Sequence, residues 1–143
     1  IITFFGNKGD IQINTRLSTF DSSFEISGSE NSDLLNEYNS IIRKYNMQNL
    51  DLLEIFYNAQ IENNQTRIDS VNSELENLIR KKYLYTLNFS ITNSANEISP
   101  YIAVSQIPDA NVDLLRKVYD TLPELIKDSK YGKILKEITM GLY

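Results

Sequence analysis

The spacing of hydrophobic residues changes once along the chain, close to residue 28. Before that point apolar and polar residues alternate in short runs such as Ile11-Gln12-Ile13-Asn14, a period typical of β-strands. We expect a hairpin that joins Thr3-Phe4-Phe5 to this run through the turn-like Asn7 to Asp10, and a third strand at Phe24-Glu25-Ile26. Three short strands bury little surface alone, so residues 1–28 are interpreted as the remnant of a small β module of a longer protein.

From Ser29 onward the apolar residues recur at the period of an α-helix, and residues 29–143 are predicted to form a helical domain. The first helix is expected to start near Asn31 or Ser32, since both residue types cap helices well. It continues until the apolar pattern lapses at Glu62 to Gln65, because no Gly or Pro interrupts it. Its apolar face is expected to hold Leu34, Tyr38, Ile41, Tyr45, Leu52 and Phe56.

A second long helix is expected after this polar link, and it extends to about Thr92. Thr66, Asp69 and Ser70 supply the residue types that cap a helix N-terminus. Two long helices joined by a short polar link pack antiparallel, so this part of the chain predicts a helical hairpin. The apolar stripe of the second helix is expected to hold Ile68, Val71, Leu75, Leu78, Ile79 and Phe89.

Three shorter helices are predicted in the rest of the chain. Ser99-Pro100 matches an N-cap followed by proline at the first helical position, which opens a helix from Tyr101 to Ile107. Another helix is expected from Val112 to Leu122, and the last begins near Ser129, with a stripe of Tyr131, Leu135, Ile138 and Leu142. The expected fold is α+β and mostly α: short N-terminal β-strands, a long antiparallel helical hairpin and three shorter helices.

The composition of the chain excludes several kinds of chemistry. With no cysteine and no histidine, it cannot form a disulfide, a thiolate metal site or a Ser-His-Asp triad. The formal charge of −5 opposes binding to the phosphates of nucleic acids. The five glycines never have the spacing of a phosphate-binding loop. We therefore nominate no residue for catalysis, cofactor binding or metal binding, and we do not expect an enzyme.

Acidic residues on the two long helices are one remaining candidate for a site. Such carboxylates could form an acid and base pair or bind a metal, but metal sites in helical bundles usually add a Glu-x-x-His pair, which this chain lacks. A solvated helix face is the favoured interpretation. The carboxylates considered are those of Glu54, Glu62, Glu74 and Glu76.

The tyrosines and a basic run are the other candidate. Arg80-Lys81-Lys82 lies next to Tyr83 and Tyr85, and such a patch could stack bases and hold phosphates. Half-buried tyrosines beside solvated cations are the favoured interpretation. Further tyrosines fall on the apolar stripes and are predicted to be core residues with the hydroxyl group at the rim, namely Tyr38, Tyr45, Tyr101 and Tyr131.

Several short phrases occur in an order that resembles a known family. The early part runs from Phe4-Phe5 through the segment Asn7 to Ile13 to Ile26-Ser27-Gly28-Ser29, followed by a long polar helical stretch. The later part contains Ile98-Ser99-Pro100-Tyr101-Ile102-Ala103, then Leu114 to Leu122, then Ser129-Lys130-Tyr131-Gly132-Lys133 with Leu135. Together these phrases resemble the region that precedes the thioredoxin-like domain in envelope thioredoxin-family lipoproteins of Gram-negative bacteria.

The resemblance implies a location in the cell envelope, in the periplasm or at the outer membrane, with a lipid anchor upstream of Ile1. The Cys-x-x-Cys motif of the family has no counterpart in this cysteine-free chain, so no disulfide reductase activity is assigned. What the resemblance implies is a non-catalytic accessory segment. It would position a thioredoxin-like domain in cis or contact the client proteins of that domain.

Two alternatives from other classes remain open. The chain could be a free-standing helical protein of the envelope that binds a small ligand or peptide between its helices, which an apolar pocket lined by tyrosines would favour. An enzyme that uses only Asp, Glu, Tyr, Lys or Ser would need two carboxylates facing each other in a cleft. As the interaction surface we predict the link and helix tips from Glu62 to Gln65, because exposed tips are free to contact partners.

Overall fold

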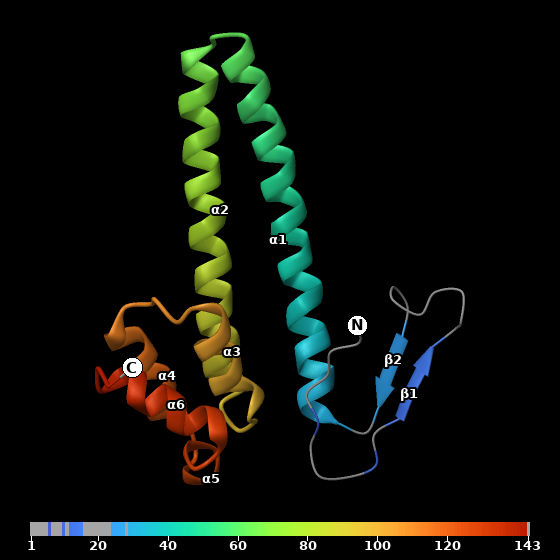
Figure 1. The fold of residues 1–143 in the computed structure, drawn as a ribbon, viewed down its shortest axis with the longest axis vertical. Helices are drawn as coiled ribbons and strands as arrows, with labels where there is room; N and C mark the ends of the chain where they lie inside the picture. Colours follow the sequence, from blue (N-terminus) through green and yellow to red (C-terminus); the bar gives the residue numbers. More distant parts are fainter. Residues whose placement is uncertain (1–5, 7–9, 11, 16–23, 28, 143) are drawn as a thin grey trace.

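The computed structural model of the protein describes residues 6, 10, 12–15, 24–27 and 29–142 (Figure 1). Strands β1 (Gln12–Thr15) and β2 (Phe24–Ser27) pair antiparallel. The helices are α1 (Glu30–Ile61), α2 (Gln65–Thr92), α3 (Ile98–Gln106), α4 (Val112–Thr121), α5 (Glu124–Lys127) and α6 (Lys130–Thr139). The prediction that the chain is mostly helical is confirmed.

The strand predicted at Phe24 to Ile26 is present as β2, and its partner in the sheet is β1. The first strand that the sequence predicted, Thr3-Phe4-Phe5, lies outside the described residues, as does Asn7-Lys8-Gly9 in the predicted turn. The register sets Gln12 opposite Ser27 and Thr15 opposite Phe24.

Helices α1 and α2 are joined by the residues between Ile61 and Gln65 and lie beside each other along their length (Figure 1). Each begins at a polar cap: the Ser29 hydroxyl group accepts from the backbone N–H of Ser32, and the Asn64 side chain accepts from that of Arg67. The caps predicted at Asn31 or Ser32 and at Thr66 are therefore wrong, because both helices begin slightly earlier. The link turns sharply at Asn63, whose φ of 54° is a left-handed value that asparagine tolerates.

The predicted cap of α3 is also wrong, for a reason that lies far away in the sequence. The helix begins at Ile98 rather than after Ser99, and the backbone N–H of Ile98 donates to Oδ1 of Asn31 at 3.0 Å. Asn31 lies in the first turn of α1, so one buried amide ties the start of α1 to the start of α3. The Ser99 hydroxyl group instead donates to the carbonyl oxygen of Ser90 at 2.6 Å.

Four short helices follow α2, where the sequence predicted three. The additional helix is α5, a single turn that begins after Pro123. The predicted cap at Ser129 is confirmed, because its hydroxyl group accepts from the backbone N–H of Gly132 in α6. The predicted stripe of α6 is too long, since Leu142 follows the helix and is 73 % exposed.

The core lies at one end of the molecule, in a part that we call the base: α3 to α6 with residues 30–42 of α1 and 83–92 of α2. One cluster joins α2 to the short helices around Leu115, Val118 and Leu135, which are fully buried. A second joins α1, α2 and α3 around Tyr38 and Ile98. Among the described residues, no helix is both long and apolar enough to cross a membrane.

Candidate interaction surface

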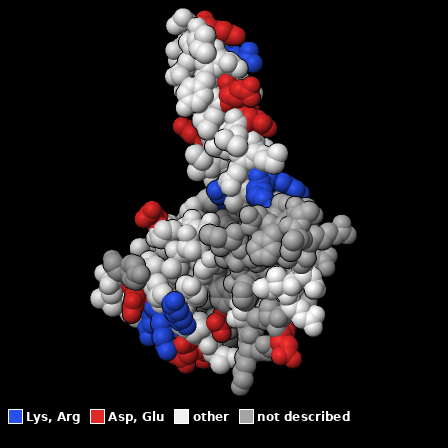
Figure 2. Space-filling view, turned by 45° about the vertical axis from the view of Figure 1, so that its right-hand side comes forward, with Lys and Arg blue, Asp and Glu red and all other residues white. Residues whose placement is uncertain are grey.

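Residues 43–82, which we call the distal segment, extend away from the base as a narrow projection (Figures 1 and 2). The segment consists of the far halves of α1 and α2 and the link between them. Its buried hydrophobic residues are Ala59, Val71 and Leu78, whereas the base holds all the other buried hydrophobic residues that the structure describes. The distal segment therefore has a thin seam of apolar contacts and two largely solvated outer sides.

One outer side of the distal segment carries four large apolar residues, with Glu54 among them. Met47, Leu50, Tyr57 and Ile61 follow one another on α1 at spacings of three, seven and four residues, which places them on one face of the helix. Their exposed fractions are 66 %, 65 %, 58 % and 78 %. We call these four residues the exposed face. Single exposed apolar residues are ordinary, but several large ones on one helix face make this face a candidate interaction surface.

Charge is divided along the same segment. Where it joins the base, the side chains are cationic, and toward the tip they are mostly anionic (Figure 2). The cations at the neck are Arg43, Lys44, Arg80, Lys81 and Lys82; the carboxylates beyond them are Asp51, Glu54, Glu62, Asp69, Glu74 and Glu76, with Arg67 as the one cation among them. The distal segment is therefore an electrostatic dipole with its negative end at the tip.

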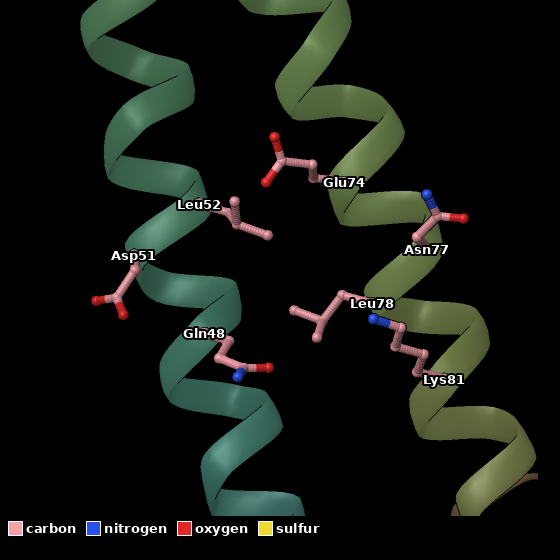
Figure 3. A pocket seen from close by; sticks show the side chains of 7 residues that line it. All are labelled: Gln48, Asp51, Leu52, Glu74, Asn77, Leu78 and Lys81. Carbon is pink, nitrogen blue, oxygen red and sulfur yellow. The ribbon is translucent and has the colours of Figure 1, made fainter.

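The two helices leave an open hollow of about 380 Å³ between them, which we call the seam groove (Figure 3). Leu52 and Leu78 form its floor, and the carboxylate of Glu74 points into it. Asp51 belongs to the rim but points away from α2. The groove is lined with polar groups around two leucines, so it can accept an apolar side chain flanked by polar ones.

A cluster of aromatic rings closes the seam where it meets the base. Tyr38 is buried and lies with its ring centroid 5.8 Å from that of Tyr85 and 5.1 Å from that of Phe89. The hydroxyl groups of Tyr38 and Thr86 are 2.9 Å apart, and Thr86 donates to the carbonyl oxygen of Lys82. Since Thr86 has one hydrogen to give, Tyr38 is the donor in their mutual bond.

Burial is the main cause that raises the pKa of Tyr38 above its ordinary value. Burial also raises the pKa of Tyr85, helped by the nearby carboxylate of Glu37. Both rings are therefore neutral at physiological pH and act as packing residues.

The structure separates most of the charged residues that the sequence singled out. Glu54 and Glu62 are exposed on α1 and at its end, and among the described residues no group of three His, Cys, Asp or Glu side chains could hold a metal ion. Glu74 lines the seam groove together with Lys81. Lys82 donates to Oδ1 of Asn46 at 3.1 Å, across the seam.

The remaining tyrosines lie at the edges of packed regions. Tyr45 and Tyr83 are half-buried, and Tyr45 contacts the ring of Tyr85. Tyr101 and Tyr131 are half-buried and meet edge to face at 4.9 Å, which joins α3 to α6. The link and first helical residue predicted as the interaction surface, Glu62 to Gln65, are exposed at the tip of the distal segment.

The arrangement as a whole is that of a small helical base with a projecting helix pair. The chain matches no family model, no curated protein and no solved structure. Since no relative indicates a function, a proposal has to rest on the exposed face, the division of charge and the seam groove.

Proposed function

We propose that this protein is a non-catalytic interaction module that binds a protein partner along the exposed face, with α1 and α2 acting as an antiparallel hairpin that holds this face away from the base. The observation that carries the proposal is the row of Met47, Leu50, Tyr57 and Ile61, each more than half exposed. Covering apolar side chains removes their surface from water, so these four residues supply a driving force for association.

The thin seam of the distal segment supports the same proposal. A pair of helices buries its apolar residues on one side only, whereas three or four helices share a common core. A partner helix laid on the exposed face would complete such a bundle and would stabilise the projection. A rigid helical face of this kind fits a helix-in-groove or helix-on-helix contact with another protein.

The resemblance to the region before the thioredoxin-like domain of envelope lipoproteins supplies a context for this proposal. In that context the module is an accessory segment that positions a thioredoxin-like domain in cis or contacts its clients. The intact mass and thiol content of the native protein from its source cells test the context. A larger protein with a reactive dithiol supports it, and a native protein without thiols contradicts it.

Photo-crosslinking in the source cells tests the interaction itself. A photoreactive phenylalanine analogue is placed at Leu50 on the exposed face or, as a control, at Leu125, which is 82 % exposed on the base. We expect discrete protein adducts from position 50 and none of the same size from position 125. If position 50 gives no adduct, or both positions give the same ones, the proposal is wrong.

A second candidate function is binding of a short peptide or small ligand in the seam groove, which its two leucines and its volume of about 380 Å³ favour. Native mass spectrometry of the protein purified from its source cells would show a co-purified ligand as added mass. Leu52→Phe would narrow the groove and should remove that mass, whereas Leu125→Phe on the base should leave it unchanged. A native protein without added mass removes this candidate.

A further inference from the structure

We propose that the partner on the exposed face is a second copy of this chain, with the two α1 helices antiparallel across a two-fold axis. The inference rests on the proposed function, because it names the occupant of the same face. An isologous contact uses one surface patch on both copies, so the patch must be complementary to itself. The charges at the two ends of the distal segment meet this requirement, whereas Glu54 lies within the exposed face near the axis.

Antiparallel pairing brings the acidic tip of one copy to the basic neck of the other. Arg43 and Lys44 at the neck would lie next to Glu62 at the tip of the partner helix, and the same pairs would form twice. Parallel pairing would place neck against neck and tip against tip, so like charges would face each other. The division of charge along the segment therefore selects the antiparallel arrangement.

The spacing of the exposed face fixes the register. The row from Met47 to Ile61 is about 21 Å long at the rise of an α-helix. With the two-fold axis level with residue 52 along α1, on the side of the helix away from the seam, Met47 lies opposite Tyr57 of the second copy, and Leu50 lies near Glu54. Each apolar residue of the row is then covered by an apolar side chain or by the aliphatic stem of a charged one.

The area involved indicates a weak dimer. Burying the exposed parts of these side chains on both copies removes about 1,000 Å² in total, the lower end for a specific interface. Association should therefore depend on protein concentration, and salt should weaken it because the charged pairs are exposed to solvent.

The absence of cysteine from the chain permits a sharp test. Two single variants of the full chain, Met47→Cys and Tyr57→Cys, are oxidised separately and as a mixture. Antiparallel pairing brings positions 47 and 57 together, so the mixture should form a covalent heterodimer. In each variant alone the two cysteines lie about 15 Å apart along the helices, beyond the reach of a disulfide, so a covalent dimer should be nearly absent.

Two results would overturn the inference. A mixture of folded variants that forms no heterodimer at any concentration shows that the copies do not pair in this register. A covalent dimer of Met47→Cys alone shows that position 47 meets its own copy rather than position 57. Circular dichroism of each variant establishes that it is folded, which is expected because both positions are exposed.

Sedimentation of the cysteine-free chain gives an independent measurement. Leu50→Glu should abolish the concentration-dependent rise in mass, whereas the control Leu125→Glu on the base should retain it.

The crosslinks from position 50 separate this inference from the proposed function. Adducts with other proteins alone overturn the second copy as partner and leave the interaction module standing, whereas no adduct overturns both.

Discussion

At the scale of single residues, Tyr38 shows how burial and hydrogen bonding together fix a protonation state. Its ring packs against those of Tyr85 and Phe89, and its hydroxyl group donates to Thr86. An ionised Tyr38 would lose this donated bond and would carry a charge away from water, which is costly. The neutral form is therefore the one that the fold stabilises.

This burial predicts a loss of stability in alkaline solution. The pKa of Tyr38 is raised in the folded protein, so its contribution is complete below the pKa of the unfolded chain, about 10, and is lost as the pH rises through the folded value. Urea unfolding between about pH 9 and pH 11 should show a falling free energy of unfolding. Tyr38→Phe should flatten this fall, although not completely, since the pKa of Tyr85 is raised too. The exposed variant Tyr57→Phe should not change it, and an equal effect of both variants would contradict this account.

Single residues also show what local sequence could predict. The cap at Ser129 could be predicted because it bonds to Gly132, three positions away. The role of Asn31 could not, because its amide bonds to Ile98, 67 positions away, and no local pattern records such a contact. Asn31 was recognised as a good capping residue, but its side chain accepts from a backbone N–H at the start of α3 and not of α1.

At the scale of elements, the contact between α5 and α6 depends on one glycine. A Cβ atom on Gly132 would lie 2.2 Å from the carbonyl oxygen of Ile126 and 2.6 Å from that of Lys127. Both are backbone atoms, so relief requires the two helices to move apart. We expect Gly132→Ala to lower the free energy of unfolding by about 1–3 kcal/mol, a typical cost of overpacking.

Urea unfolding measures this difference, and Lys133→Ala is a suitable control because it changes an exposed neighbour in the same helix. The control should stay within about 0.5 kcal/mol of the unmodified protein. A neutral Gly132→Ala would mean that α5 and α6 do not approach each other as closely as described.

Periodicity predicted the long helices and, on α2, the buried residues Val71, Leu78 and Phe89, but it missed part of the buried face of α1. On α1 the predicted stripe included Leu34 and Ile41, whereas the buried residues are Leu35 and Ile42, which share a cluster with Phe89 of α2 and Ile98 of α3. The residues of the exposed face are also regularly spaced in the sequence. They were not predicted, because only one apolar stripe was assigned to each helix. Only the structure shows which stripe remains uncovered.

At the scale of the whole molecule, the base and the distal segment should differ in local stability. Amides near Tyr38 and Ile42 are supported by a buried core, whereas those between Met47 and Asn58 are held by one thin seam. In dilute protein we expect hydrogen exchange in the distal part of α1 to show at least about tenfold lower protection than in its basal part. Uniform protection along α1 would show that the helix pair opens only with the base.

The bond between Asn31 and Ile98 also makes the length of the projection independent of the base. This bond holds the start of α1 next to the start of α3. The two long helices between these points therefore begin and end at fixed positions in the base. Adding or removing seven residues in each long helix would keep the seam in phase and change the reach by about 10 Å. Variants lengthened or shortened by heptads would thus change how far the projection reaches, without any change in the fold that anchors it.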